Sequence, residues 1–593
     1  MDQADVRVKT AQLADDLAWL EEHVAAKPDG AQRRGLQRLA AGMVRNIAAP
    51  FLERHGPVPL HVCVVGGAGA GKSTVANLLL GTMLAESNPQ AGFTRHPIGF
   101  AAADAKLPAS LGFLGPLRRL EKSESARLDQ DVYQLRRVAS NQPENLLLER
   151  FVVWDCPDMT TWASSHYATR LLEIAALSDV IVYVASDERY NDEVPTQYLR
   201  LFLEAGKSVV VVLVKMREAD APAFLAHFEK EVVAKLPARP FAILAIPQLS
   251  AEELADPIHR AARFRIPLVN QVSVLGETPT DARRRSAHAV VAHLKAHQDS
   301  LLAAAREDLS ALEGWRRGVQ EGQIEFENRY RKEYLTAERF RRFDETLVRL
   351  LELLELPAIG KILSQGMNLL RLPYTMLKGW FKREPAVSPT RILAEKPVLD
   401  AALRGWIDTL RKDAALKRDQ HPLWQHLHEG FQQSLGDRCR EKFDKLADDF
   451  HASLTVEVER TARAILEDLE KSPVALNTLR GSKFALDVAA VVGGVFLGGL
   501  TPISVVLVPL AASVSQYLVD LLGENYVAMR REETRSRQLA LFNQQLAFPL
   551  ADWLTSWPTT DGSIYERLQI ITRRLPANVA LLENAIAGVD GSS

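Results

Sequence analysis

Short apolar runs alternate with amphipathic stretches over residues 57–276 of this 593-residue chain. Five of these runs are mostly rich in β-branched side chains, which favours buried strands. They are Val62–Val65, Phe151–Trp154, Val180–Val184, Val209–Val214 and Ala242–Ile246. Because helical stretches separate them, the pattern predicts an α/β domain with a mostly parallel sheet covered by helices on both faces.

Strand patterns end at about residue 276, and residues 277–593 show long helical patterns. They predict a large all-helical bundle or stalk domain. Residues 1–56 show two amphipathic helices split by Lys27-Pro-Asp-Gly30. Their apolar stripes need a partner surface, and we expect them to pack on the helical domain. The sequence therefore predicts three parts, with boundaries near residues 56 and 276.

Composition narrows the class of protein. The chain is too long for one hydrophobic core, and 47% apolar with 25% charged residues is typical of globular domains. A net charge of −2 gives no overall reason to expect nucleic acid as a partner. Three cysteines far apart in sequence indicate a reducing compartment without a disulfide framework or zinc site. The polar N-terminus does not resemble a secretory signal, so we expect a cytoplasmic protein.

The stretch after the first predicted strand carries the clearest chemistry. Gly66, Gly71, Lys72 and Ser73 match the phosphate-binding pattern G-x-x-x-x-G-K-[ST], and a helical run follows. Glycines let backbone N–H groups surround phosphates at a helix N-terminus. Lys72 would neutralise the β- and γ-phosphates, and Ser73 would ligate Mg²⁺. The candidate nucleotide-binding loop is Gly66, Gly67, Ala68, Gly69, Ala70, Gly71, Lys72, Ser73 and Thr74.

Two residues further along complete a predicted magnesium site. Thr94 lies between the first helix of the domain and its second strand, where a threonine can close on Mg²⁺ and the γ-phosphate. Asp155 ends a predicted strand and would hold the water shell of the metal. The predicted metal-binding residues are therefore Ser73, Thr94 and Asp155.

The segment Asp155-Cys-Pro-Asp158 resembles the translation-factor-class GTPases, whose motif at this place is D-x-P-G. The resemblance implies that a backbone N–H here binds the γ-phosphate, but the usual glycine is Asp158. A carboxylate beside a triphosphate is unfavourable unless it faces metal or water, so Asp158 either positions water or points away. Met159 stands where relatives carry a water-orienting Gln, which predicts slow hydrolysis without self-assembly or a partner. The candidate catalytic residues are Lys72, Thr94 and Asp158.

The base-reading segments are less regular. Lys215 follows the strand Val209–Val214 and matches the lysine of the N/T-K-x-D motif, whose stem covers the purine. Arg217 replaces the aspartate that pairs with guanine, and Asp220 could take that role from a longer loop. Ser250-Ala251 resembles the final S-A base loop. The pattern favours GTP as ligand and substrate, and ATP stays open.

Residues 356–383 form a basic amphipathic segment. They contain no acidic residue, and their apolar residues recur mostly at three- and four-residue steps, opposite the cations. This composition is typical of a helix in an anionic membrane surface, although a core helix of the bundle is the alternative. The five cations are Lys361, Arg371, Lys378, Lys382 and Arg383.

A second apolar stretch, residues 488–519 within a predicted hydrophobic hairpin at 484–523, carries no charge. Thr501-Pro502 splits it into limbs of roughly 20 and 25 Å, shorter than the ~30 Å hydrocarbon core. A hairpin entering one leaflet, a bent single span and a hairpin buried in the bundle all stay open.

This order of parts resembles the bacterial dynamin-like proteins, in which GTPase heads dimerise and a helical stalk holds membrane. The resemblance implies a membrane-associated GTPase that self-associates through its heads, peripheral at the inner face of an anionic membrane. Two alternatives stay open. One is a soluble Era-like or ribosome-associated regulatory GTPase, and the other is a nucleotide-binding scaffold with little hydrolysis.

Overall fold

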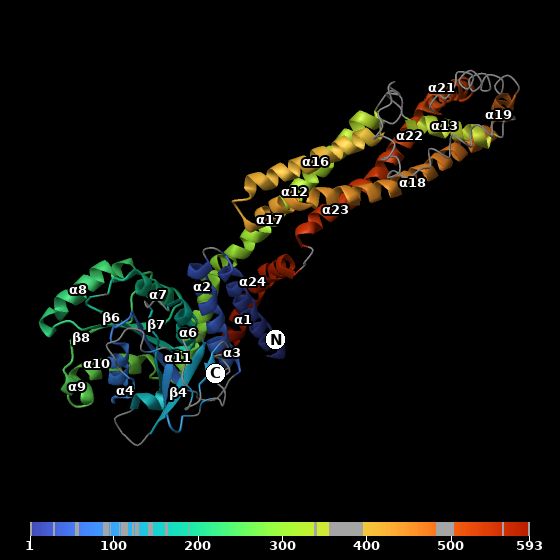
Figure 1. Cartoon of the computed structure of the whole chain (residues 1–593). Helices are drawn as coiled ribbons and strands as arrows, with labels where there is room; N and C mark the ends of the chain where they lie inside the picture. Colours follow the sequence, from blue (N-terminus) through green and yellow to red (C-terminus); the bar gives the residue numbers. More distant parts are fainter. Residues whose placement is uncertain are drawn as a thin grey trace. The chain divides into compact units, whose positions relative to one another are not determined.

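The structure of the chain is a computed structural model (Figure 1). It describes residues 3–27, 30–53, 59–86, 94, 96–105, 107, 117–120, 124, 130–139, 146–159, 164–188, 190–336, 341–354, 395–481, 503–559 and 563–590. The contacts divide the chain into two compact units. We call Met1–Arg306 with Arg567–Ser593 the sheet unit, and Glu307–Glu566 the helical unit.

The sheet unit is built on a sheet whose described part has eight strands in the order β3-β4-β2-β5-β1-β6-β7-β8. The strands are β1 (Leu60–Gly66), β2 (Ile98–Ala102), β3 (Arg118–Arg119), β4 (Val132–Val138), β5 (Phe151–Asp155), β6 (Val180–Ser186), β7 (Ser208–Val214) and β8 (Ala242–Ile246). All neighbouring pairs are parallel except β2 and β5, which are antiparallel. The mostly parallel sheet expected from the sequence is confirmed.

Five strands, β1, β5, β6, β7 and β8, run parallel to one another, so their carboxyl ends meet at one edge of the sheet. Val64 of β1 aligns with Asp155 of β5. The loops that follow these strands therefore come together, which is where parallel α/β sheets bind ligands.

Helices cover both faces of this sheet (Figure 1). Alternate side chains of β1, β5, β6 and β7 form one core with α4 (Lys72–Leu80), α5 (Leu146–Arg150) and α10 (Ala262–Leu275). On the opposite face, α6 (Ser164–Leu177) contacts β1 and α7 (Glu193–Glu204) contacts β7. Nearly every residue of the central strands is buried, which explains why these runs are continuously apolar rather than alternating.

The sheet unit contains helices before, between and after its strands. They are α1 (Gln3–Ala25), α2 (Gly30–Met43), the π-helix η1 (Val44–Ala48), α3 (Ala49–Leu52), α4 (Lys72–Leu80), α5 (Leu146–Arg150), α6 (Ser164–Leu177), α7 (Glu193–Glu204), η3 (Glu218–Asp220), α8 (Ala221–Glu231), η4 (Val233–Lys235), α9 (Ala251–Ala255), α10 (Ala262–Leu275) and α11 (Pro279–Ala296). The chain leaves this unit within α12 (Gln298–Tyr330) and returns within α24 (Ser563–Asp590).

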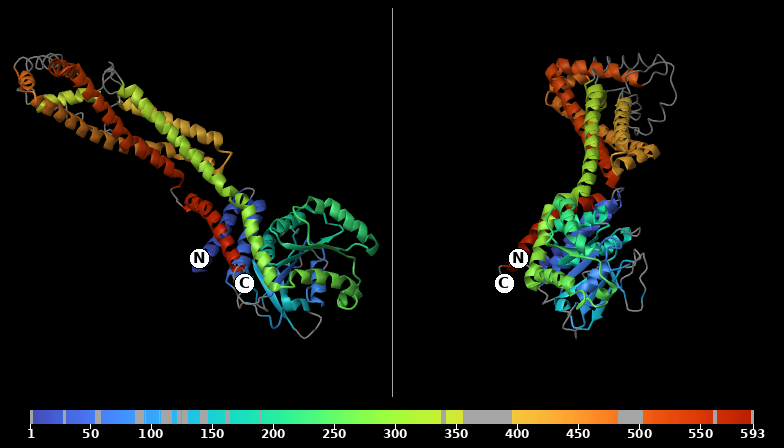
Figure 2. Two further views of the ribbon diagram at one scale, coloured as in Figure 1. Left: turned by 180° about the vertical axis from the view of Figure 1, so that it is seen from behind. Right: turned by 90° about the vertical axis from the view of Figure 1, so that its left-hand side faces the viewer.

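The N-terminal helices belong to the sheet unit, a different division from the boundary expected near residue 56. A Cβ added at Gly42 would lie 2.6 Å from the Cβ of Ala176, so α2 packs closely on α6. Asp16 of α1 pairs with Arg574 of α24, and Figure 2 shows α24 beside the N-terminal helices. These helices thus find their apolar partners on the sheet domain and on the returning end of the chain.

The helical unit contains the following elements after the first part of α12. They are the π-helix η5 (Arg331–Leu335), α13 (Arg341–Leu353), α16 (Glu395–Lys417), α17 (Pro422–Gln433), α18 (Leu435–Glu470), α19 (Pro473–Arg480), α21 (Ile503–Leu522), α22 (Glu524–Phe542), the π-helix η6 (Asn543–Ala547), α23 (Phe548–Ser556) and η7 (Trp557–Thr559). No strand occurs among its described residues, which confirms the predicted helical region.

A buried polar network lies within the apolar core of this unit. Tyr330 donates its hydroxyl proton to Glu395 at 2.8 Å, and Gln538 donates to the Tyr330 oxygen at 2.6 Å. Arg342 pairs with Glu345 and with Glu395, each at 2.7 Å. These side chains come from α12, α13, α16 and α22, so the network fixes four helices relative to one another.

The two segments predicted to contact a membrane, residues 356–383 and 488–519, both belong to the helical unit. The basic segment 356–383 lies outside the described residues, as does the first limb of the 488–519 run. Within the described part of α21, Leu510, Val514 and Leu518 are buried in the core of the helical unit. Among the described residues, no helix combines the length and apolarity that a bilayer crossing requires.

Close packing between α12 and α16 generates a test of this fold. A Cβ added at Gly322 would lie 2.1 Å from Trp406, whereas one at Gly318 would lie 3.7 Å from Leu410. We expect Gly322→Ala to destabilise the helical unit by about 1–3 kcal/mol through overpacking. Gly318→Ala, on the same helix, is expected to be neutral or to stabilise it by up to about 1 kcal/mol. Urea denaturation followed by circular dichroism measures both, and equal midpoints for the two variants would contradict this packing.

Candidate phosphate and magnesium site

The loop after β1 is shaped by three glycines. A Cβ at Gly66 would lie 2.3 Å from the carbonyl oxygen of Val184, so only glycine fits there. Gly69 and Gly71 have φ of 68° and 88°, in the left-handed region that favours glycine. Gly71 is the residue before α4, which begins at Lys72. The chain therefore turns directly from a buried strand into a helix N-terminus, a geometry suited to binding anions.

Lys72 is almost fully buried inside this turn. Its Nζ donates a hydrogen bond to the carbonyl oxygen of Gly67 at 3.0 Å and forms an ion pair with the carboxylate of Asp158. The two side chains are only 5% and 8% exposed. The backbone N–H of Met159 donates to the oxygen of Gly66 at 3.3 Å, which keeps the segment after β5 against the loop.

Ser73 and Asp155 are in contact, as the predicted magnesium site requires. The Ser73 hydroxyl donates to Oδ2 of Asp155 at 2.9 Å. The other carboxylate oxygen, Oδ1, is buried and has no hydrogen-bond partner. A hydroxyl and a carboxylate with one unpaired oxygen are the oxygen ligands that a hard divalent cation prefers. These residues therefore fit Mg²⁺.

The electrostatics of Asp155 agree with this fit. Burial raises the pKa of Asp155 to about 6 from its ordinary 3.8, although the charge of Lys72 and the hydrogen bond from Ser73 oppose that rise. The neighbouring charge of Asp158 adds to the increase. The site thus holds two carboxylates against one ammonium group, and an additional cation would stabilise the ionised form of Asp155.

Thr94 is half-buried, and none of the contacts among the described residues joins it to Ser73 or Asp155. Two residues on, His96 is half-buried, and the pKa of its imidazole is lowered to about 4 by partial burial and by the nearby charges of Arg170 and Arg136. The fully buried Arg170 of α6 pairs with Asp131 at 3.1 Å. The sequence pattern did not indicate this buried cation near the Thr94 loop, because a single arginine within a helix carries no motif.

On the base side, Lys215 adopts a φ of 73°, which is uncommon for a residue with a side chain. Strained backbone conformations of this kind cluster at functional sites, so the φ of Lys215 is consistent with a role in binding. Asp220 accepts a hydrogen bond from Arg217 at 2.6 Å. The two residues that depart from the base-reading motif are therefore paired with each other.

Ser250 caps the helix α9. Its hydroxyl accepts a hydrogen bond from the Glu253 N–H at 3.2 Å, and Glu253 in turn accepts from the Ser250 N–H at 2.8 Å. Ala251 is the first residue of α9. This reciprocal cap gives the Ser250-Ala251 loop a defined conformation without a ligand.

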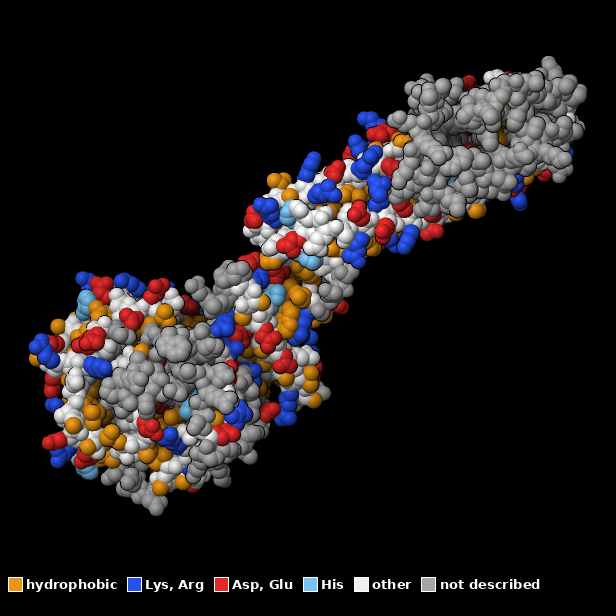
Figure 3. Space-filling model, in the orientation of Figure 1, with side chains coloured by type: hydrophobic (Ala, Val, Ile, Leu, Met, Phe, Trp, Pro, Cys, Tyr) orange, Lys and Arg blue, Asp and Glu red, His pale blue; other side chains and the backbone are white. Residues whose placement is uncertain are grey.

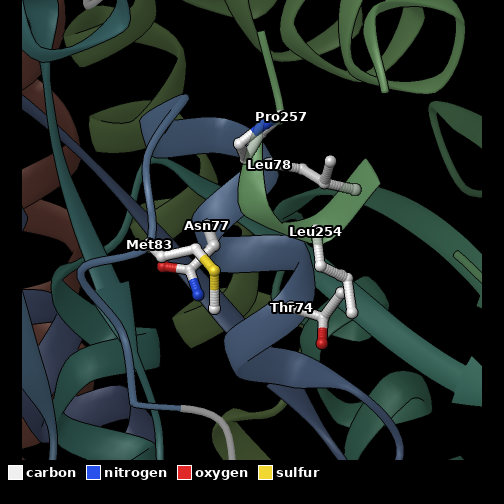
Figure 4. Close-up of a pocket in the computed structure, with 6 residues that line it drawn as sticks. All are labelled: Thr74, Asn77, Leu78, Met83, Leu254 and Pro257. Atoms are coloured by element: carbon white, nitrogen blue, oxygen red, sulfur yellow. The ribbon is translucent and has the colours of Figure 1, made fainter. Parts of the chain in front are cut away.

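A small cavity of about 30 Å³ lies beside α4 (Figure 4). Its lining residues come from α4, from the segment after it, and from α9 and the residues that follow. They are Thr74, Asn77, Leu78, Met83, Leu254 and Pro257. The cavity has room for about one or two waters rather than a purine. It places Thr74 of the phosphate loop and the segment after Ser250-Ala251 on two sides of one space.

The structure therefore brings most of the sequence-predicted residues to one edge of the sheet. The phosphate loop, Asp155, Lys215 and Ser250 all lie at or after the carboxyl ends of parallel strands. Sequence reasoning missed the contact between Lys72 and Asp158, which lie 86 residues apart. The unusual aspartate was the available signal, but its partner could not be deduced from spacing. Among the described residues, no cluster of three or more His, Cys, Asp or Glu side chains is suited to a metal.

Comparison with known protein families identifies one domain, which contains the phosphate loop and Asp155. Residues 61–215 match the family model described as "50S ribosome-binding GTPase". No curated protein matches the sequence.

Three solved structures match over most of the chain. Two belong to an oligomerised bacterial dynamin pair described as sensing and tethering membranes. One is 11% identical, with 90% of each chain covered and a TM-score of 0.36, and the other is 10% identical, with 98% covered and a TM-score of 0.36. The third is the LeoA bacterial dynamin GTPase from ETEC, 13% identical with 98% of each chain covered and a TM-score of 0.23. Likenesses this remote carry no argument about function.

The raised pKa of Asp155 predicts a stability cost for the nucleotide-free chain. The pKa of Asp155 in the folded chain, about 6, exceeds its ordinary value of 3.8, so ionisation of this carboxyl favours unfolding. The loss of folding free energy is absent below about pH 4 and complete above about pH 6. We expect Asp155→Asn to raise the free energy of unfolding by about 1–3 kcal/mol at pH 7.5, and by roughly half of that at pH 5.

Chemical denaturation at the two pH values measures this difference. Glu229→Gln removes an exposed carboxylate from α8 and should change stability by less than about 0.5 kcal/mol at either pH. A lower stability of Asp155→Asn at pH 7.5 would contradict the cost assigned to burial.

Proposed function

Residues 61–215 form a domain of the P-loop GTPase family, and from that premise we propose that the chain is a GTP-hydrolysing switch whose helical unit acts at a membrane surface. The family match confirms the class of domain expected from Gly66–Thr74 and Asp155. The observation that carries the nucleotide part is the contact between Ser73 and Asp155 below a glycine turn. It unites a metal-binding hydroxyl and carboxylate with a phosphate-binding loop.

Mg²⁺ would be held by Ser73 directly and by Asp155, through its unpaired Oδ1 or through water. Bound there, the ion supplies positive charge to the β- and γ-phosphate oxygens as the transferred phosphoryl group develops negative charge. Thr94 closes the site from its loop when the third phosphate is present. Support for this part comes from the burial of Asp155 beside a second carboxylate, that of Asp158.

Hydrolysis needs an oriented water as well as bound phosphates. Lys72 neutralises the phosphates, and Asp158 is the polar side chain after β5 that can orient water once it leaves Lys72. Met159, which is buried, has no group that can polarise water. We therefore infer slow turnover by the isolated chain and faster turnover when heads associate with one another or with a partner.

For the base, the chain offers Lys215, Asp220, Ser250 and Ala251. Because the backbone of Lys215 is in the left-handed region, the loop after β7 leaves the strand in a different direction from a regular strand end. Asp220 would reach a guanine only after releasing Arg217, which is 86% exposed and has ample room to move. We propose GTP as the substrate, with weaker use of ATP.

The membrane part of the proposal rests on residues 356–383, whose polar positions are basic without any acid. Their structure lies outside the described residues. On the face shown in Figure 3, the described helices of the helical unit carry interspersed positive and negative side chains, which gives that face no single-sign patch. The basic segment is therefore the feature that would give the helical unit affinity for anionic lipid, with the protein peripheral at the inner face of the membrane.

A nucleotide assay tests the first half of the proposal. We expect Mg²⁺-dependent phosphate release from GTP to exceed that from ATP and to fall at least tenfold in Lys72→Ala, because the phosphates lose their buried cation. Lys235→Ala removes an exposed lysine of the same unit and should keep full activity. Wild-type release no higher than that of Lys72→Ala, with or without Mg²⁺, would refute hydrolysis.

Flotation with vesicles tests the second half. The chain should float with vesicles containing anionic lipid, and less so with neutral vesicles or in high salt, because the attraction is electrostatic. Replacing Lys378, Lys382 and Arg383 by Gln should abolish flotation. Replacing the exposed Arg404 and Arg411 of α16, together with the exposed Arg418 just after it, by Gln removes the same charge and should have little effect. Absence of flotation in every nucleotide state would remove the membrane from the proposal.

A further inference from the structure

The ammonium group of Lys72 already has an anionic partner from its own chain. Asp158 pairs with it inside the phosphate loop, and both side chains are almost completely shielded from solvent. Breaking one partner from a buried ion pair leaves an uncompensated charge, which is strongly unfavourable unless another charge replaces it. Any ligand that uses Lys72 must therefore be compatible with Asp158 or must take its place.

The donors of Lys72 limit what can bind beside it. An ammonium group has three N–H donors, and the contacts with the Gly67 oxygen and Asp158 use two of them. One donor is left for a phosphate oxygen. A diphosphate needs Lys72 at its β-phosphate only, whereas a triphosphate needs it at both the β- and γ-phosphates.

The γ-phosphate and the Asp158 carboxylate thus compete for one N–H donor. If both remained, two anions would lie side by side in a poorly solvated space, where like charges repel strongly. Asparagine at this position would keep the shape and the hydrogen bond but would remove the charge. The glycine of the D-x-P-G motif would remove the competitor altogether.

We propose that Asp158 is a specificity-determining residue that disfavours the third phosphate. A nucleoside diphosphate binds beside the intact Lys72–Asp158 pair, and a nucleoside triphosphate binds only when its γ-phosphate replaces the Asp158 carboxylate on Lys72. This inference rests on the proposed function, since it requires the loop at Gly66–Thr74 to bind guanine nucleotides.

Displacement of Asp158 would also report the third phosphate to the rest of the sheet unit. Asp158 lies between β5 and α6 along the chain. Glu173 of α6 pairs with Arg45 of η1 at 2.9 Å, and α2 packs closely on the same helix. Displacement of Asp158 would therefore act on the chain shortly before a helix that packs against the N-terminal helices.

The test compares equilibrium affinities for GDP and for a non-hydrolysable GTP analogue, both with Mg²⁺, using fluorescent nucleotides and the full chain. Wild type is compared with Asp158→Asn and with Asp158→Gly. Glu229→Gln, which also removes one negative charge, is the matched control. Thermal melting of each variant shows that it is folded, and Asp158→Gly replaces Asp158→Asn in the comparison if the latter is not.

We expect the affinity for the triphosphate analogue to rise at least tenfold in the Asp158 variants, with GDP affinity changed less than threefold and both unchanged in Glu229→Gln. An unchanged ratio of the two affinities overturns the proposal. So does a weaker triphosphate affinity, which would identify Asp158 as a ligand of the metal or nucleotide. Failure of wild type to bind either nucleotide would instead overturn the proposed function itself, and with it this inference.

Discussion

Charge enclosed at the ends of β1 and β5 is the constraint on which the candidate site depends. Lys72, Asp155 and Asp158 are all buried there, so two carboxylates lie beside one ammonium group. Burial is the main cause of the raised pKa of Asp155, and the charge of Asp158 adds to it, although Lys72 and the hydrogen bond from Ser73 oppose the rise. A divalent cation would offset the excess of negative charge beside Asp155. Binding of a cation is thus favoured by the excess negative charge that remains in the folded site.

The pairing of β1 with β5 keeps these charges together. Parallel pairing aligns Val64 with Asp155, and Gly66 approaches the Val184 carbonyl more closely than any side chain would allow. The backbone bonds from Cys156 to Val64 and from Met159 to Gly66 then continue the path of β5 along the end of β1. Rigid strands therefore position the buried groups, and the loops that follow them supply the parts that can move.

Beyond the site, the chain uses buried polar contacts to specify its helices. The N-terminal helices are joined to α6 by the Arg45–Glu173 pair and to α24 by the Asp16–Arg574 pair. In the helical unit, Tyr330, Arg342 and Glu395 form a network inside an aromatic core. Paired charges of this kind add modest stability, but they define register, because a shifted helix would leave a charge unpaired.

The sequence alone determined the five central strands, the helical character of residues beyond 277, the phosphate loop and the place of Asp155 at the end of a strand. Each is a local pattern, since a buried parallel strand is apolar throughout and a glycine turn needs its residues at set positions. The strands β2, β3 and β4 went unrecognised. β4 carries exposed and half-exposed polar residues such as Gln134 and Arg137, and β3 has two residues only. Only the tertiary structure decided that α1 and α2 join the sheet unit and that Asp158 pairs with Lys72. Both outcomes depend on segments far apart in the chain, and an amphipathic stripe or a lone aspartate does not carry the identity of its partner.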